Sequence, residues 1–230
     1  MLNVHFVFDL IAASCSGGLT FLLSRGVLAR GLERVNTMGW VYYLGLSVGA
    51  IWGAFFFGSL NLWVSGEDIL GRSILGALVG AILFVEVAKA WLGQVGSTGA
   101  LFVPAFTIST VIGRWGCYFT GLEDQTVGVR TTLPWGVDFG DGPRHAVMLY
   151  ESGAMAVFFI GCLYLMRFHL TYFQKYGFYL MCICYGGQRF LWEFLKPYGT
   201  VIGPFNVFHL CCIALIGYGI CMMVAAQKRA

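Results

Sequence analysis

Residues 72–95 read RSILGALVGAILFVEVAKAWLGQV, an almost uninterrupted apolar run. A helix needs about 20 mostly apolar residues to cross the hydrocarbon layer of a bilayer. Gly76 and Gly80 lie four residues apart in this run, and such spacing of small residues is typical of membrane helices that pack closely. The stretch therefore predicts a membrane-spanning helix with one tightly packed face.

Six further stretches repeat this pattern along the chain. Only 11% of the 230 residues are charged and 58% are hydrophobic, whereas soluble domains carry about 25% charge. Lipid must therefore cover much of the surface, and only helices or closed barrels satisfy their backbone there. We expect a single all-α membrane domain over residues 1–230, whose first stretch is a span and not a cleaved signal peptide. The seven expected spans are 5–24, 38–64, 72–95, 100–121, 145–168, 175–195 and 203–225.

The connections between these spans are short except for residues 122–144, which are rich in Gly, Asp, Thr and Pro. This segment is the one place where a small lobe outside the membrane fits. Cytoplasmic loops are enriched in Lys and Arg, so basic residues indicate the orientation. With seven spans, we expect the N-terminus and the lobe outside and the C-terminus in the cytoplasm. The basic residues that then share the cytoplasmic side are Arg25, Arg30, Arg34, Arg167, Lys175, Lys228 and Arg229.

Cysteine and histidine usage gives little sign of special chemistry. The eight cysteines form no CxxC pair and lie in or near apolar stretches, as packing residues do. The four histidines are scattered without ligand spacing, so no metal site is predicted. The net charge of +3 is small, and nothing indicates nucleic-acid binding.

Several ionisable residues fall inside the predicted spans, where a charge costs at least about 2.5–3.5 kcal/mol. Glu86 and Lys89 are three residues apart on one helix, so we expect a structural ion pair there. The others fall in the outer half of the membrane in the expected topology, where they predict one polar cavity that opens outward. These residues are Asp9, Arg114, Glu151, Arg189 and Glu193.

Arginines at the depth of the headgroups suggest an anionic phospholipid as the ligand, because the planar guanidinium fork suits phosphate. Two other interpretations stay open on these grounds alone. One is a structural network of ion pairs, Arg114–Glu151 and Arg189–Glu193, that only holds helices together. The other is a transport pathway, although no inverted repeat is visible in the sequence.

Three motifs make the sequence more specific. They are GRWGCYFTG at 113–121, LPWGV at 133–137 followed by RHAVMLYE at 144–151, and YGGQRFLWEF at 185–194. In this order and spacing they resemble the prolipoprotein diacylglyceryl transferases of bacteria. The resemblance covers the whole chain loosely and residues 113–194 closely.

The resemblance implies a seven-span enzyme of the bacterial cytoplasmic (inner) membrane that needs no cofactor. Such enzymes transfer the diacylglyceryl group of phosphatidylglycerol, a membrane lipid, to the lipobox cysteine thiol of a prolipoprotein and release glycerol phosphate. The residues with an implied catalytic role are Arg189, Tyr185, Glu193, His145 and Glu151. Those with an implied role in substrate binding are Arg114, Arg144, Gly116, Gly121 and Tyr150.

The chain departs from the family pattern where the thiol would be handled. Leu75 stands where the family has a histidine, Cys117 and Thr120 replace two asparagines, and Ala146 and Met148 replace Pro and Gln. A substitute base, with His145, Glu151 or Glu193 as candidates, is one way to obtain a thiolate. Arginines that lower the pKa of the incoming thiol are the other, which we favour. The alternatives to the whole reading are a related transferase with another acceptor and a non-catalytic phospholipid-binding protein.

Overall fold

The computed structural model of the chain describes residues 4–228. Arg229, which the sequence places on the cytoplasmic side, lies outside this range. The helices are α1 (Val4–Arg25), α2 (Ala29–Asn36), α3 (Trp40–Val64), α4 (Ile74–Trp91), η1 (Ala100–Phe102), α5 (Val103–Thr120), η2 (Gly121–Asp124), α6 (Val147–Phe168), α7 (Leu170–Glu193) and α8 (Val207–Gln227). The strands are β1 (Val137–Asp138) and β2 (Pro143–Arg144).

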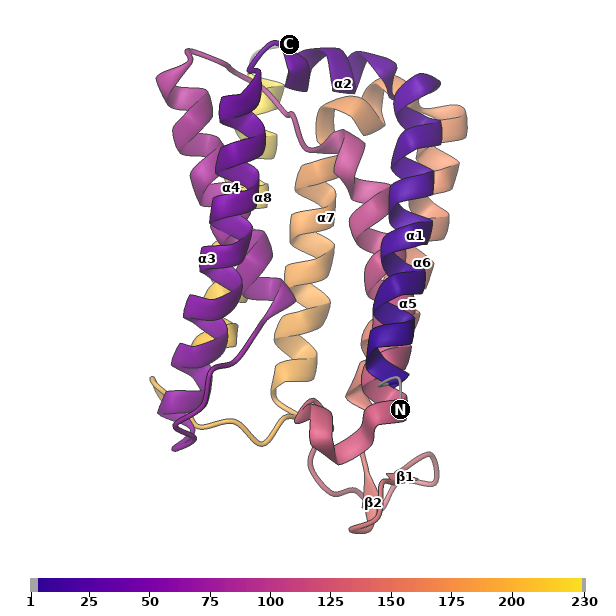
Figure 1. Cartoon of the computed structure of the whole chain (residues 1–230), viewed down its shortest axis with the longest axis vertical. Helices are drawn as coiled ribbons and strands as arrows, with labels where there is room; N and C mark the ends of the chain where they lie inside the picture. Colours follow the sequence, from indigo (N-terminus) through magenta and orange to yellow (C-terminus); the bar gives the residue numbers. More distant parts are fainter. Residues whose placement is uncertain (1–3, 229–230) are drawn as a thin grey trace.

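The long helices run side by side along the length of the molecule (Figure 1). Among the described residues, six helices are long and apolar enough to cross a membrane: α1, α3, α4, the continuous segment Ala100–Asp124, α6 and α8. The 24-residue α7 runs along the middle of the bundle, but polar residues such as Gln188, Arg189 and Glu193 interrupt its apolar sequence (Figure 1). The protein is thus all-helical with six clear candidate spans, and a crossing by α7 stays a prediction.

The two ends of the described chain lie at opposite ends of the bundle (Figure 1). The start of α1 lies beside the small lobe, whereas the end of α8 lies at the far end, near α2. The helix α2, which was not among the elements expected from the sequence, lies across that far end of the bundle and carries Arg30 and Arg34. Termini at opposite ends indicate an odd number of passes along the bundle.

Paired glycines bring α3 and α4 into backbone contact. A Cβ atom added to Gly49 would lie 2.5 Å from the carbonyl oxygen of Gly80, and one added to Gly53 would collide with Gly76. No side chain fits at such distances, so the absence of Cβ atoms allows the close approach. The prediction that Gly76 and Gly80 serve helix packing is confirmed.

The lobe at residues 122–144 extends beyond the ends of α5 and α6 (Figure 1). Its two strands are antiparallel, with Val137 opposite Arg144. The lobe is joined to the end of α7 by a hydrogen bond of 2.7 Å from the Val129 amide to the Leu195 carbonyl. The hydroxyl of Tyr198 also donates to the Gln125 carbonyl at 3.1 Å. A small lobe therefore forms where the sequence predicts one, and its outward placement stays a prediction.

The ion pair expected between Glu86 and Lys89 in α4 is present. The Nζ atom of Lys89 donates to Oε1 of Glu86 at 2.7 Å, and the Tyr218 hydroxyl of α8 donates to the same oxygen at 2.8 Å. Both charged groups thus have partners inside the bundle. All eight cysteines are free thiols, in agreement with a packing role.

Candidate functional site

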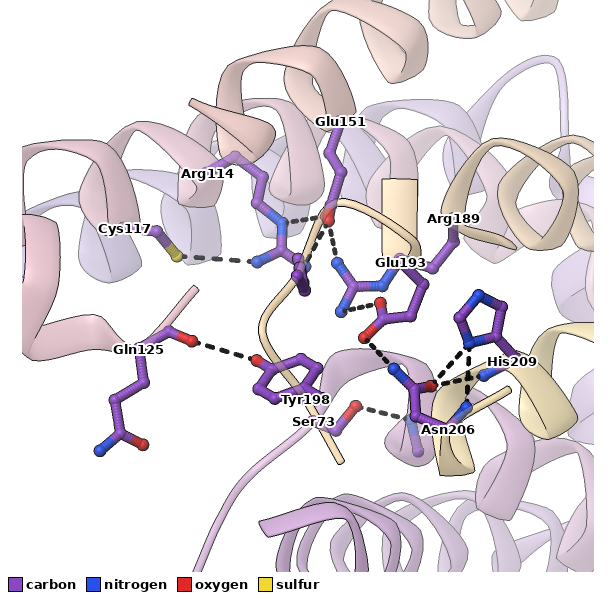
Figure 2. Close-up of polar contacts among 12 residues, drawn as sticks. Ser73, Arg114, Cys117, Gln125, Glu151, Arg189, Glu193, Tyr198, Asn206 and His209 are labelled. Atoms are coloured by element: carbon purple, nitrogen blue, oxygen red, sulfur yellow. Dashed lines mark hydrogen bonds and ion pairs between the residues drawn. The ribbon is translucent and has the colours of Figure 1, made fainter. Parts of the chain in front are cut away.

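Glu151 is the centre of a buried polar cluster (Figure 2). It lies in the second turn of α6 and has no exposed surface. Its Oε2 atom pairs with Nε of Arg114 from α5 at 2.6 Å. Its Oε1 atom pairs with Nη1 of Arg189 from α7 and accepts from Nζ of Lys196 at 3.1 Å. One carboxylate therefore connects α5, α6, α7 and the segment after α7.

Tyr185, Arg189 and Glu193 lie on one face of α7, as their four-residue spacing predicts. Nη2 of Arg189 pairs with Oε2 of Glu193 at 3.2 Å. Oε1 of Glu193 accepts from Nδ2 of Asn206 at 3.3 Å, and Asn206 caps α8 by accepting from the His209 amide (Figure 2). The cluster is thereby connected to the start of α8.

Tyr185 completes this face one turn before Arg189. Its side chain is fully buried, and its hydroxyl lies near the guanidinium of Arg114. Its ring meets that of Phe106 edge to face, with 5.0 Å between centroids. Phe106 also lines an apolar cavity of about 360 Å³, whose walls come mainly from α3, α4, α5, α7 and α8. This edge-to-face pair of rings therefore lies between the polar cluster and the apolar cavity.

The cluster contains more positive than negative groups. Arg114, Arg189 and Lys196 face two carboxylates, and all five side chains are buried. Both ion pairs expected from the sequence, Arg114–Glu151 and Arg189–Glu193, are present. Burial, reinforced by the charge of Arg189, lowers the pKa of Lys196 well below its ordinary value. An anion in this cluster would offset the surplus charge.

Other residues that the sequence singles out lie outside the cluster. Arg144 binds Asp141 within the lobe, through Nε–Oδ1 and Nη2–Oδ2 contacts of 2.8 and 2.5 Å. Nδ1 of His145 lies 3.3 Å from the Tyr150 hydroxyl, where α6 leaves the lobe. Asp9, expected in the same cavity, instead pairs with His5 and its side chain is 56% exposed. In place of the single cavity that the sequence predicts, the structure thus has a buried cluster and separate pairs of residues away from it.

Gly116 and Gly121 have backbone explanations. A Cβ atom on Gly116 would lie 3.0 Å from Cβ of Phe8, so this glycine lets α1 pack closely against α5. Gly121 ends α5 with φ of +67°, a conformation that L-residues rarely adopt. A contact of either glycine with a substrate stays a prediction.

Sequence reasoning missed two members of the cluster, Lys196 and Asn206. Lys196 follows Glu193 by three residues, just before the helix-breaking Pro197, so its spacing offered a weak signal. Asn206 begins the last apolar run and reads as an ordinary helix cap. Leu75, at the position of the family histidine, is fully buried in the apolar core.

The fold and the site define a polytopic helical membrane protein with a buried arginine–carboxylate cluster beside an apolar cavity. A family model described as prolipoprotein diacylglyceryl transferase matches residues 27–225. The chain belongs to this family. No solved structure matches it significantly.

Three curated relatives illustrate the distance within the family, and each is named phosphatidylglycerol–prolipoprotein diacylglyceryl transferase. The protein of Finegoldia magna is 29% identical over 56% of this chain and 50% of its own length. That of Thermosynechococcus vestitus is 29% identical over 70% and 61%. That of Nitratidesulfovibrio vulgaris is 26% identical over 83% and 77%. The chain thus spans about half to three-fifths of the first two relatives.

Proposed function

We propose that this protein transfers the diacylglyceryl group of phosphatidylglycerol to the lipobox cysteine thiol of a prolipoprotein. The observation that carries the proposal is the buried cluster of three cations and two carboxylates next to an apolar cavity. A phospholipid suits both parts chemically, because its phosphate is anionic and its acyl chains are apolar. Family membership and the names of the relatives support the same activity.

In this proposal Arg114 and Arg189 hold the donor phosphate and stabilise the charge that develops on it as it leaves. Both guanidiniums are held by Glu151, which fixes their planes relative to each other. The acyl chains occupy the apolar cavity behind Tyr185 and Phe106. The carboxylates of Glu151 and Glu193 position these groups, and Lys196 adds a third positive charge while it is protonated.

The reaction is a displacement at the glyceryl carbon. The sulfur of the acceptor forms a bond to that carbon, and the carbon–oxygen bond to the phosphate breaks. The electron pair leaves with glycerol phosphate, next to the arginines. Arg144 belongs to β2 of the lobe, and His145 and Tyr150 lie where the chain passes from β2 into α6. We assign them to the approach of the acceptor, and Gly116 and Gly121 to the shape of the site.

The proposed setting is the bacterial inner membrane, with α7 as the seventh span. The start of α1 and the lobe face outward, and the end of α8 faces the cytoplasm. The arginines of α2 then lie on the cytoplasmic side, as does the end of α8. This agrees with the enrichment of basic residues on that side of membranes. Labelling of a cysteine introduced at Ala230 by an impermeant reagent from outside the cell would contradict this orientation.

Labelled phosphatidylglycerol and a lipobox peptide offered to the purified protein test the activity. We expect the peptide to gain the mass of a diacylglyceryl group, while a peptide with serine in place of cysteine gains none. Release of glycerol phosphate without peptide modification would indicate another acceptor. Saturable binding of phosphatidylglycerol without any turnover would overturn the transferase and favour a lipid-binding protein.

A further inference from the structure

Three potential metal ligands from distant parts of the chain meet beside the cluster. They are His5 from α1, Cys117 near the end of α5 and Asp124 at the end of η2, and their ligand atoms lie within 4.8 Å of one another. Nε2 of His5 lies 3.7 Å from Sγ of Cys117 and 3.3 Å from Oδ1 of Asp124. The sequence predicted no metal site, because ligands at positions 5, 117 and 124 have no recognisable spacing.

The distances from His5 to Cys117 and to Asp124 are close to those expected around a tetrahedral ion. Zn–S bonds of about 2.3 Å and Zn–N or Zn–O bonds of about 2.0 Å, at tetrahedral angles, place ligand atoms about 3.3 to 3.6 Å apart. The mixed nitrogen, sulfur and oxygen set suits zinc or cobalt, whereas calcium and magnesium prefer oxygen alone. Three protein ligands leave a fourth coordination position, as in zinc sites that act on a substrate.

Groups behind the ligands support the same interpretation. Nδ1 of His5 lies 2.9 Å from Oδ2 of Asp9, which leaves Nε2 as the nitrogen that faces the other ligands. The second oxygen of Asp124 accepts from the Thr126 hydroxyl at 2.5 Å. Histidine and carboxylate ligands of metals are characteristically oriented by such outer hydrogen bonds.

The helix packing also brings the ligands together. A Cβ atom at Gly116 would lie 3.4 Å from the His5 carbonyl oxygen and 3.0 Å from Cβ of Phe8. The glycine thus lets α1 approach α5 at the turn that carries His5. Nη1 of Arg114 lies 3.8 Å from Sγ of Cys117, so one guanidinium contacts both Cys117 and Glu151 (Figure 2).

We propose that His5, Cys117 and Asp124 bind a zinc-like divalent cation whose fourth coordination position takes the acceptor thiol as a thiolate. The second half of this proposal rests on the proposed function. A thiol that coordinates such an ion loses its proton, here to solvent. The sulfur electron pair then forms the bond to the glyceryl carbon, and the bond from that carbon to the phosphate oxygen breaks. The ion thus promotes loss of the thiol proton, a step for which the Leu75 side chain offers no base.

Cobalt provides the first test, because it binds zinc sites and reports its ligands by colour. The purified full-length protein in detergent should bind one Co²⁺ per chain and show a thiolate-to-cobalt charge-transfer band. Cys117→Ser should lose the band and most of the metal. Cys162→Ser, at a buried thiol of α6, should keep both. Lack of stoichiometric Co²⁺ in the parent, or unchanged binding by Cys117→Ser, would overturn the site.

Asp9→Asn provides a milder variant, since it keeps all three ligands. Loss of the carboxylate behind His5 should weaken Co²⁺ binding about 10- to 100-fold while the band persists at saturating metal. An unchanged affinity would contradict the ligand role of His5. Because the side chain of Asp9 is largely exposed, this substitution leaves the helix core intact.

The lipobox peptide tests the fourth position. Its addition to the Co²⁺-loaded protein should intensify the charge-transfer band, and the serine version of the peptide should not. An unchanged spectrum at peptide concentrations that bind would overturn the thiolate half of the proposal. These readouts need no turnover: a protein that binds Co²⁺ but transfers no lipid would retain the metal site and refute the transferase.

Discussion

Two arginine–carboxylate groups in this protein use the same chemistry in opposite surroundings. In the lobe, Arg144 and Asp141 are three residues apart, and their side chains are 18% and 29% exposed. Around Glu151, the partners come from α5, α7 and the segment after α7, and Glu151 has no exposed surface. Solvent screens the first pair, whereas the second must satisfy every charge by direct contact. We therefore expect the burial of an ion pair, more than the number of its contacts, to determine how much it contributes to stability.

Loss of the shared carboxylate should have the largest effect. Glu151→Gln leaves Arg114, Arg189 and Lys196 with a neutral partner in a buried site. Removal of one partner of a buried ion pair typically costs about 3–5 kcal/mol, so the folded protein should lose a comparable free energy of unfolding. Thermal unfolding in detergent measures the loss. Asp141→Asn in the lobe is the matched control, and an equal effect of both substitutions would remove the distinction between the two groups.

Replacement of arginine by lysine should affect transfer activity more in the cluster around Glu151 than in the lobe. Arg114→Lys and Arg189→Lys keep a charge but lose the bidentate fork. Each should reduce diacylglyceryl transfer about 10²- to 10³-fold, the usual effect of removing a donor to a developing charge. Arg144→Lys should retain most of the activity in the same assay. Full activity of both buried variants would reduce Arg114 and Arg189 to a structural role.

A substitution at Leu75, where the family has a histidine, should have a smaller effect on transfer. Leu75→His adds an imidazole at a fully buried apolar position, and we expect a modest change in the rate of transfer. Deprotonation of the acceptor does not depend on this position in our proposal. Comparison of parent and variant with the lipobox peptide decides the matter. A parent that is inert and a variant that turns over would show that the natural protein lacks its base.

Lys196 should make donor binding sensitive to pH. Burial first, and then the charge of Arg189, lower its pKa, so it loses its proton earlier than an ordinary lysine as the pH rises. Binding of an anionic lipid should weaken as the pH rises through that lowered pKa. Lys196→Arg stays charged throughout and should flatten the profile. A profile of phosphatidylglycerol affinity against pH, identical for both proteins, would exclude Lys196 as the titrating group.

The smallest effect should come from acid on the lobe. The hydrogen bond from Arg144 holds the pKa of Asp141 below its usual range, and backbone amides of Gly140 and Gly142 do the same for Asp138. A carboxyl with a depressed pKa stabilises the fold above its unfolded pKa of about 3.9 and ceases to do so as the pH falls through the folded value. Hydrogen exchange at the lobe should therefore accelerate in acid before exchange in the bundle does. Simultaneous acceleration would contradict this order.

Much of the fold follows from hydropathy. The expected span 38–64 corresponds to Trp40–Val64, and 145–168 corresponds to Val147–Phe168. The eight-residue α2 escaped prediction because it is too short and too charged to stand out as an apolar run. Within the site, helical spacing placed Tyr185, Arg189 and Glu193 on one face correctly.

The remainder of the site depends on contacts between segments far apart in sequence. Lys196 and Asn206 lie at either end of the connection between α7 and α8, where no periodicity indicates the direction of a side chain. His5 meets Cys117 only because α1 packs beside α5 at Gly116. Such meetings are determined by tertiary packing, which the linear pattern does not contain.

The paired glycines of α3 and α4 have a mechanical consequence. Residues of both helices, among them Tyr42, Leu78 and Ile82, form one wall of the apolar cavity. Because Gly49 and Gly80 are in backbone contact, neither helix can slide along the other without a collision. If the cavity widens to admit a two-chain lipid, we therefore expect α3 and α4 to move together as one unit.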